Sequence, residues 1–151
     1  MGSPSRDSVV SLRALTAANV DAVCDLAVHP SQTRFVAANA RSIALAHVSP
    51  HAWVRAIHAD ETPIGFVMLD LAPDAPAFLW RFMIDARYQG LGLGRRALDL
   101  VLAHVRATRA DPAVETCVAQ AEGGPQRFYE AAGFVLTGEY EDGQAVMRRD
   151  P

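Results

Sequence analysis

The stretch that decides the fold of this chain is Gln89-Gly90-Leu91-Gly92-Leu93-Gly94-Arg95-Arg96. An apolar run over residues 78–84 precedes it, and a helical pattern of apolar residues over 97–105 follows it. A strand, a glycine-rich turn and the start of a helix form a site for anions. Glycine lets the backbone come close to a ligand, and the first amides of the helix point toward it. The stretch therefore predicts a ligand that carries phosphates.

The hydrophobic patterns on both sides of this turn predict an α+β fold. Alternation with a period of two marks strands, and apolar residues three and four positions apart mark helices. The expected strands are 9–15, 53–59, 64–71, 77–84, 114–119, 134–140 and 144–148, and the expected helices are 18–28 (capped by Thr16), 31–48, 97–105 and a short one between Pro125 and Gly133. The order β-α-α-β-β-β-α-β-α-β-β predicts a mixed, mostly antiparallel sheet with helices on both faces. Strands 77–84 and 114–119 should be parallel, joined by a right-handed crossover.

Length and charge narrow the kind of protein. The chain has 151 residues, which suits one domain over 9–151 after a short lead, 1–8, that we expect to be disordered. A net charge of −3 argues against nucleic acid as a partner. No apolar run is long enough to span a membrane, and the first residues lack the pattern of a signal peptide.

The reactive residue types exclude several chemistries. All fourteen basic residues are arginine, so no lysine is present to form a Schiff base. The five histidines show no spacing typical of metal ligands, and we expect no metal. The two cysteines, Cys24 and Cys117, lie in separate apolar segments, which predicts buried thiols and a reducing, cytoplasmic location.

Two other interpretations of the glycines have to be weighed. Gly92-x-Gly94-x-x-Ala97 matches a loose dinucleotide-binding fingerprint. That fingerprint belongs to a starting βαβ unit, whereas antiparallel strands are expected before this turn and too few residues follow for a second nucleotide-binding half. The glycines also fit a plain tight turn before a helix.

A second motif, Phe128-Tyr129-Glu130-Ala131-Ala132-Gly133-Phe134, lies about forty residues after the glycine turn. Together the two motifs resemble those of the GNAT superfamily of acyl-CoA N-acyltransferases, and the resemblance extends over residues 9–148. It implies that strands 77–84 and 114–119 splay apart and that acetyl-CoA lies in the opening. The pyrophosphate would then bind the turn amides, and the pantetheine arm would bind a strand edge. The cofactor-binding residues implied are Met83, Ile84, Gln89, Gly90, Leu91, Gly92, Leu93, Gly94, Arg95 and Phe128.

The resemblance also implies catalytic roles. Tyr129 matches the tyrosine that serves in this family as the general acid for the departing thiolate. The glutamate that many members carry in the strand before the glycine turn is missing here, because apolar residues occupy that strand. Glu122 is a candidate base, acting directly or through a water molecule, and a solvated loop acid is the alternative. Asp85 is a weaker candidate that is more typical of a cap for the turn.

The acceptor is less well defined. The segment Val28-His29-Pro30-x-Gln32-x-x-Phe35 and its continuation to Ser42 resembles the spermine/spermidine or diamine acetyltransferase group, which implies acceptor contacts from Gln32, Phe35, Asn39 and Arg41. No Asp or Glu lies between Ala27 and His58, although that stretch contains three arginines. A cationic site disfavours a polycation, whereas the resemblance favours a polyamine. A polyamine, a small monoamine and an amine bearing a carboxylate are therefore all candidate acceptors.

Other functions and assemblies also remain. The same fold is compatible with a non-catalytic acyl-CoA sensor or with acetylation of a protein N-terminus. The final hairpin should expose sheet edges, which favours a homodimer.

Overall fold

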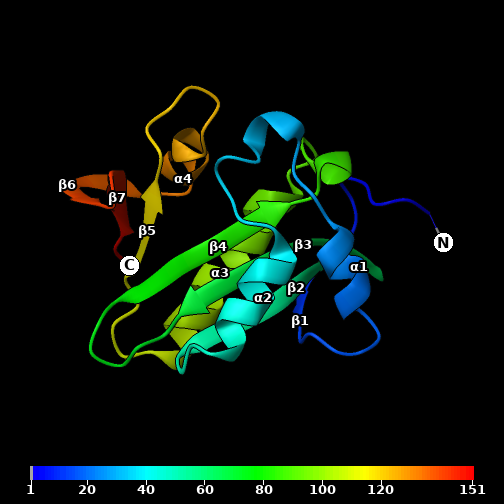
Figure 1. Cartoon of the computed structure of the whole chain (residues 1–151), viewed down its shortest axis with the longest axis horizontal. Helices are drawn as coiled ribbons and strands as arrows, with labels where there is room; N and C mark the ends of the chain where they lie inside the picture. The colour runs from blue at the N-terminus through cyan, green and yellow to red at the C-terminus, as the bar shows by residue number, and fades with distance from the viewer. Residues whose placement is uncertain (1) are drawn as a thin grey trace.

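A computed structural model describes residues 2–151. Met1, the first residue of the expected lead, lies outside the described residues. Seven strands form one sheet in the order β1-β2-β3-β4-β5-β7-β6, and β4 and β5 are its parallel pair (Figure 1). The α+β class is therefore confirmed. The elements are β1 Val10–Arg13, α1 Val20–Asp25, α2 Asn39–His47, β2 Ala52–Ala59, β3 Thr62–Asp70, β4 Ala77–Ile84, α3 Leu93–Thr108, β5 Val114–Val118, α4 Gln126–Ala131, β6 Val135–Glu141 and β7 Gln144–Arg149.

Two apolar layers hold the helices to opposite faces of the sheet, as Figure 1 shows for α2 in front and α3 behind. The apolar stripe of α3 is fully or almost fully buried from Leu93 to Val105 and forms part of one layer. Val23 of α1 and the partly buried Ile43 of α2 pack on the other layer with Phe66 and Met68 of β3. Among residues 2–151, no helix combines the length and apolar character needed to cross a membrane.

The sheet divides between its two parallel strands. β4 pairs with β5 at only three positions, from Ala77 opposite Val114 to Leu79 opposite Thr116. A β-bulge opposite Met68 and Leu69 adds one residue to β4 just beyond this pairing, and bulges bend and twist a strand. The Thr116 hydroxyl donates to the Leu79 carbonyl at 2.9 Å where the pairing stops. Residues 80–84 of β4 therefore leave β5, and we call this division the fork.

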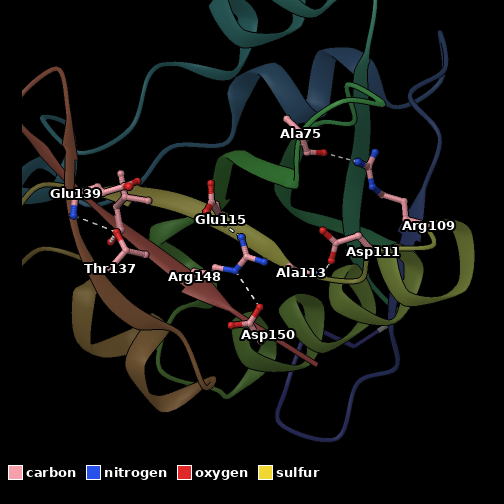
Figure 2. Close-up of polar contacts among 10 residues, drawn as sticks. Ala75, Arg109, Asp111, Ala113, Glu115, Thr137, Glu139, Arg148 and Asp150 are labelled. Carbon is pink, nitrogen blue, oxygen red and sulfur yellow. Dashed lines mark hydrogen bonds and ion pairs between the residues drawn. The ribbon is translucent and has the colours of Figure 1, made fainter.

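The strands on the far side of the fork are held by charged side chains at its base. Arg148 of β7 binds Glu115 of β5 at 3.3 Å and Asp150 at 2.9 Å (Figure 2). At the end of α3, Arg109 donates to the carbonyls of Leu71, Ala72 and Ala75, which closes the connection between β3 and β4. Between β4 and β5 themselves, backbone pairing from Ala77 to Leu79 joins the strands at this end, and they separate beyond it.

The two helices expected near the N-terminus differ from the structure. The predicted helix 18–28 is only Val20–Asp25, and Asn19 rather than Thr16 stands at its N-cap. It ends early because Asp85 accepts a hydrogen bond from the Ala27 amide, and the Ala27 carbonyl accepts one from Ala86. These tertiary bonds draw residues 26–28 into extended backbone beside the end of β4.

The predicted helix 31–48 is wrong in its first half. Pro30–Gln32 form a single turn of 3-10 helix, and α2 begins only at Asn39. The Gln32 side chain accepts from the His29 amide and exchanges hydrogen bonds with Gln89, so it joins this segment to the glycine turn. The loop 33–38 consequently spans the space above the fork as irregular backbone.

Part of the lead makes hydrogen bonds, both within itself and to α3. Ser5 to Ser8 form a hydrogen-bonded turn, with the Ser8 amide donating to the Ser5 carbonyl at 3.1 Å. Arg96 of α3 donates to the carbonyls of Ser8 and Arg6, both at 2.7 Å. A guanidinium can satisfy two carbonyls at once, which is why this segment stays on the surface of α3.

Candidate active site

One cavity of about 780 Å³ lies in the fork. It is bounded by the loop before α2, by the second half of β4, by the glycine turn, and by β5 with the start of α4. The sequence-predicted residues that line it are Gln32, Phe35, Met83, Ile84, Gln89, Gly90, Gly92, Gly94, Arg95, Phe128 and Tyr129. Segments far apart in the sequence thus form one continuous site.

The backbone of the glycine turn has the conformation and the free amide groups that an anion site needs. Gly90 and Gly92 both have φ of +78°, a conformation that favours glycine, and a Cβ built on either would meet nothing within 4 Å. In residues 2–151, Arg96 is the first residue after Gln89 whose amide donates to a carbonyl, that of Gly92 at 3.4 Å. The preceding amides, including those of Leu91 and Leu93, are the unpaired donors of a helix start. The Leu93 side chain is buried in the core, so it acts through its backbone.

The two arginines of this first turn have different environments. Arg95 lines the cavity and is held by Asp99 at 3.2 Å and by the Ala131 carbonyl at 2.7 Å. Arg96 does not line the cavity, because its guanidinium binds the carbonyls of the lead. The positive charge of the turn therefore comes from Arg95 and from the helix itself.

Tyr129 lies at the fork. It is 6% exposed and contacts Phe128 and Phe134 edge-to-face, each with ring centroids 5.3 Å apart. Burial raises the pKa of Tyr129, and the neighbouring Thr116 hydroxyl lowers it by a smaller amount. The phenol is therefore protonated at any ordinary pH, which is the form a proton donor needs.

The two carboxylates considered as bases lie outside the cavity lining. Glu122 is exposed in the loop after β5, and its carbonyl accepts a hydrogen bond from Arg34 at 3.1 Å. Asp85 is buried, accepts from the Arg87 amide at 2.9 Å and pairs with the Arg87 guanidinium at 2.8 Å. The predicted capping role of Asp85 is thus confirmed.

The expected acceptor residues separate into two groups. Gln32 and Phe35 line the cavity, and Phe35 comes within reach of Gly124 across its top. Asn39 is 3% exposed and is absent from the lining, since its amide donates to the Val23 carbonyl and the Met83 sulfur. Arg41 is exposed on α2 and is also absent from the lining.

Several residues that line the cavity were not among the predicted site residues. They include Arg34, Trp80, Arg81, Thr116 and Cys117. Arg81 carried a signal that is visible in the sequence, because it is the one charged residue of an otherwise apolar strand. Cys117 lies near Glu141, and burial together with that carboxylate raises the pKa of its thiol to about 11. The thiol is therefore a poor nucleophile at neutral pH.

The fork and the glycine turn line one cavity, an arrangement that would suit an extended ligand with phosphates at one end. Residues 20–134 match the acetyltransferase (GNAT) family. The chain therefore belongs to the acetyltransferase (GNAT) family and is an acyltransferase. Acetyl-CoA, the donor used in this family, fits the residues present, because the unpaired turn amides suit its pyrophosphate and the open edge of β4 suits its pantetheine arm.

Individual relatives are distant. The chain is 25% identical to the spermine/spermidine N(1)-acetyltransferase of Bacillus subtilis over 149 residues, covering 93% of this chain and 98% of that protein. It is 33% identical to the L-2,4-diaminobutyric acid acetyltransferase of Streptomyces avermitilis over 73 residues, 47% of this chain and 41% of that protein. Among solved structures, the PaiA N-acetyltransferase of Thermoplasma acidophilum in complex with coenzyme A has a TM-score of 0.72 at 15% identity, covering 95% and 99% of the two chains.

Proposed function

We propose that this protein transfers an acetyl group from acetyl-CoA to the primary amine of a small molecule, by direct attack within a ternary complex. The observation that carries the proposal is the continuity of one cavity from the glycine turn, along the freed edge of β4, to Tyr129 at the fork. A donor held along this edge presents its thioester beside Tyr129, and the space under the loop 33–38 admits the acceptor.

Each part of the chain has a distinct task in this proposal. The amides from Leu91 to Arg95 hold the pyrophosphate, and the backbone of Met83 and Ile84 holds the pantetheine arm. Acetyl-CoA supplies the acetyl group on an activated thioester. Tyr129 donates a hydrogen bond and then its proton to the sulfur as negative charge develops there.

The acceptor must lose a proton before it attacks. An amine of pKa ~10.4 exposes its lone pair at pH 7 at a cost of roughly 4.6 kcal/mol. The charged residues lining the cavity are Arg34, Arg81 and Arg95, and their positive charge favours the neutral amine. Since Glu122 is exposed and outside the lining, we assign it the role of a base that acts through water.

Relatives suggest particular acceptors. The Bacillus subtilis relative supports a polyamine or diamine, and the Streptomyces avermitilis relative supports an amine that also bears a carboxylate. A protein N-terminus is a further candidate acceptor. The cationic lining of this cavity disfavours a polyamine, which would bring several ammonium groups close to these arginines.

A free-thiol assay tests the proposal. Purified protein is mixed with acetyl-CoA and with spermidine, putrescine, small monoamines, amino acids or a peptide with a free N-terminus. Release of CoA that depends on the amine is the expected result. If acetyl-CoA raises the melting temperature but no amine promotes release, the proposal of a small-molecule acceptor fails, and a protein acceptor or a non-catalytic role is indicated instead.

We also propose a cytoplasmic location and a homodimer. Cys24 and Cys117 are free thiols, which suits a reducing compartment. Every residue of the edge strand β6 is exposed, including Val135, Leu136 and Tyr140. Light scattering on the purified protein tests the dimer, and a monomer at micromolar concentration would contradict it.

A further inference from the structure

Arg81 is a cation that no carboxylate neutralises. It is partly buried on β4 just beyond the fork and lines the cavity. Its Nε donates to the Ser42 hydroxyl at 3.2 Å, and its Nη1 donates to the Trp80 carbonyl at 3.1 Å. Within residues 2–151, neither Arg81 nor Arg41 forms an ion pair, whereas Arg13, Arg87, Arg95 and Arg148 each do.

The surroundings of Arg81 add to its need for an anion. Burial lowers the pKa of Arg81, and the nearby charge of Arg41 lowers it further. A guanidinium nonetheless keeps its proton, so the charge stays in the cavity. No Asp or Glu is among the residues that line this cavity. An uncompensated, partly buried charge is costly, and a ligand that brings an anion removes that cost.

The position of Arg81 relates it to the reaction centre. Leu79 pairs with Thr116, whose hydroxyl lies beside Tyr129. Arg81 is two residues further along β4, just after the bulge residue Trp80, and lines the same cavity as Thr116 and Tyr129. A group bound by Arg81 would therefore share one cavity with Tyr129.

We propose that the acceptor is a small primary amine that also carries a carboxylate, and that Arg81 binds this carboxylate. The inference rests on the proposed acetyl transfer and names its substrate class. The planar guanidinium suits a carboxylate, because it can offer that group two parallel N–H donors. A polyamine offers this cavity no anion and adds two or more cations to it.

Matched acceptors that differ only by a carboxylate test the proposal. L-2,4-diaminobutyrate is compared with 1,3-diaminopropane, and lysine with cadaverine, by CoA release. For wild-type protein we expect kcat/KM to be at least tenfold higher for the amino acid in at least one pair. In Arg81→Gln, KM for that amino acid should rise at least tenfold while kcat/KM for its diamine does not fall.

Arg55→Gln is the matched control variant. Arg55 lies over the Trp53 ring and donates to the Val54 carbonyl, much as Arg81 lies near the Trp80 ring and donates to the Trp80 carbonyl. Arg55 is absent from the cavity lining, so its loss should leave the preference for the amino acid unchanged. Arg81→Lys keeps the charge but loses the two parallel N–H donors of the guanidinium. It should retain a weaker preference for the amino acid.

The outcomes separate the two proposals. A wild-type preference for the diamine in both pairs overturns the carboxylate inference alone, as does CoA release with polyamines only. An unchanged preference in Arg81→Gln, with normal KM for acetyl-CoA, removes Arg81 from this role. If Arg81→Gln does not fold, the wild-type comparison still decides the substrate class. No release with any amine overturns the acetyl transfer and, with it, this inference.

Discussion

Replacing Gly92 by alanine tests separately how the glycine turn stabilises the fold and how it binds phosphate. Gly92 is the N-cap of α3, with φ of +78°, and its Cβ position is open. Gly138, in the exposed strand β6, has φ of +88° and is equally open. Gly138→Ala is therefore a control with similar backbone strain, and neither Gly138 nor its chain neighbours line the cavity.

The expected costs follow from this geometry. A side chain in the left-handed region costs about 1–2 kcal/mol, and in a chain of this length each kcal/mol lowers Tm by about 2–4 °C. Both variants should therefore lose roughly 2–8 °C. Only Gly92→Ala places a methyl group beside the turn amides, where a phosphate would lie. We expect its KM for acetyl-CoA to rise at least tenfold, equivalent to about 1.4 kcal/mol.

Thermal melts and steady-state kinetics at varied acetyl-CoA give the two numbers for each variant. The reasoning requires similar losses in Tm and a difference in KM. Equal KM values in the two variants would refute the assignment of the turn to phosphate binding, even if both proteins are destabilised as expected.

Three further predictions concern single side chains. Tyr129→Phe should lower kcat by about 10- to 1000-fold with KM for acetyl-CoA little changed, and normal turnover would remove its role as proton donor. Cys117→Ser should keep kcat/KM within about threefold, because a thiol with a pKa of about 11 is not the nucleophile; a loss above about 100-fold would argue against direct transfer. His58 is buried with both ring nitrogens unpartnered, and burial lowers its pKa, as does Arg13 to a lesser extent. In the unfolded chain His58 binds a proton below pH ~6.5, whereas in the folded protein it stays neutral until the pH falls further. The stability that neutral His58 contributes above pH ~6.5 is therefore lost as the pH falls through its lowered pKa. Melts between pH 8 and 5 should show a smaller loss of Tm for His58→Leu than for wild type, and parallel curves would contradict this.

The site was partly visible in the sequence because some of its chemistry is local. β4 begins and ends where the alternation predicts, and the glycine turn and the helix after it follow from composition and spacing. Tyr129 was identified by a motif within one short helix. Each of these depends on neighbours within a few residues, which a sequence displays directly.

Contacts between residues far apart in the sequence explain why the prediction for the segment before α2 was wrong. The expected helix 31–48 contained Gln32, Phe35 and Asn39. Instead Gln32 binds Gln89, fifty-seven positions away, and the loop after it presents consecutive residues to the cavity. A helix cannot do this, because only every third or fourth side chain faces one direction. Asn39 then begins a separate helix and is buried against Val23 and Met83.

By itself, the sequence determined the class of fold, the glycine turn before a helix and the residue types available to the reaction. These follow from hydrophobic period, glycine conformation and composition, which are local properties. Only the tertiary structure decided where β4 leaves β5, that Arg96 binds the lead while Arg95 lines the cavity, and that Arg81 stands there without a carboxylate. Pairing and neutralisation of charge depend on distances between groups remote in the chain, and folding alone establishes those distances.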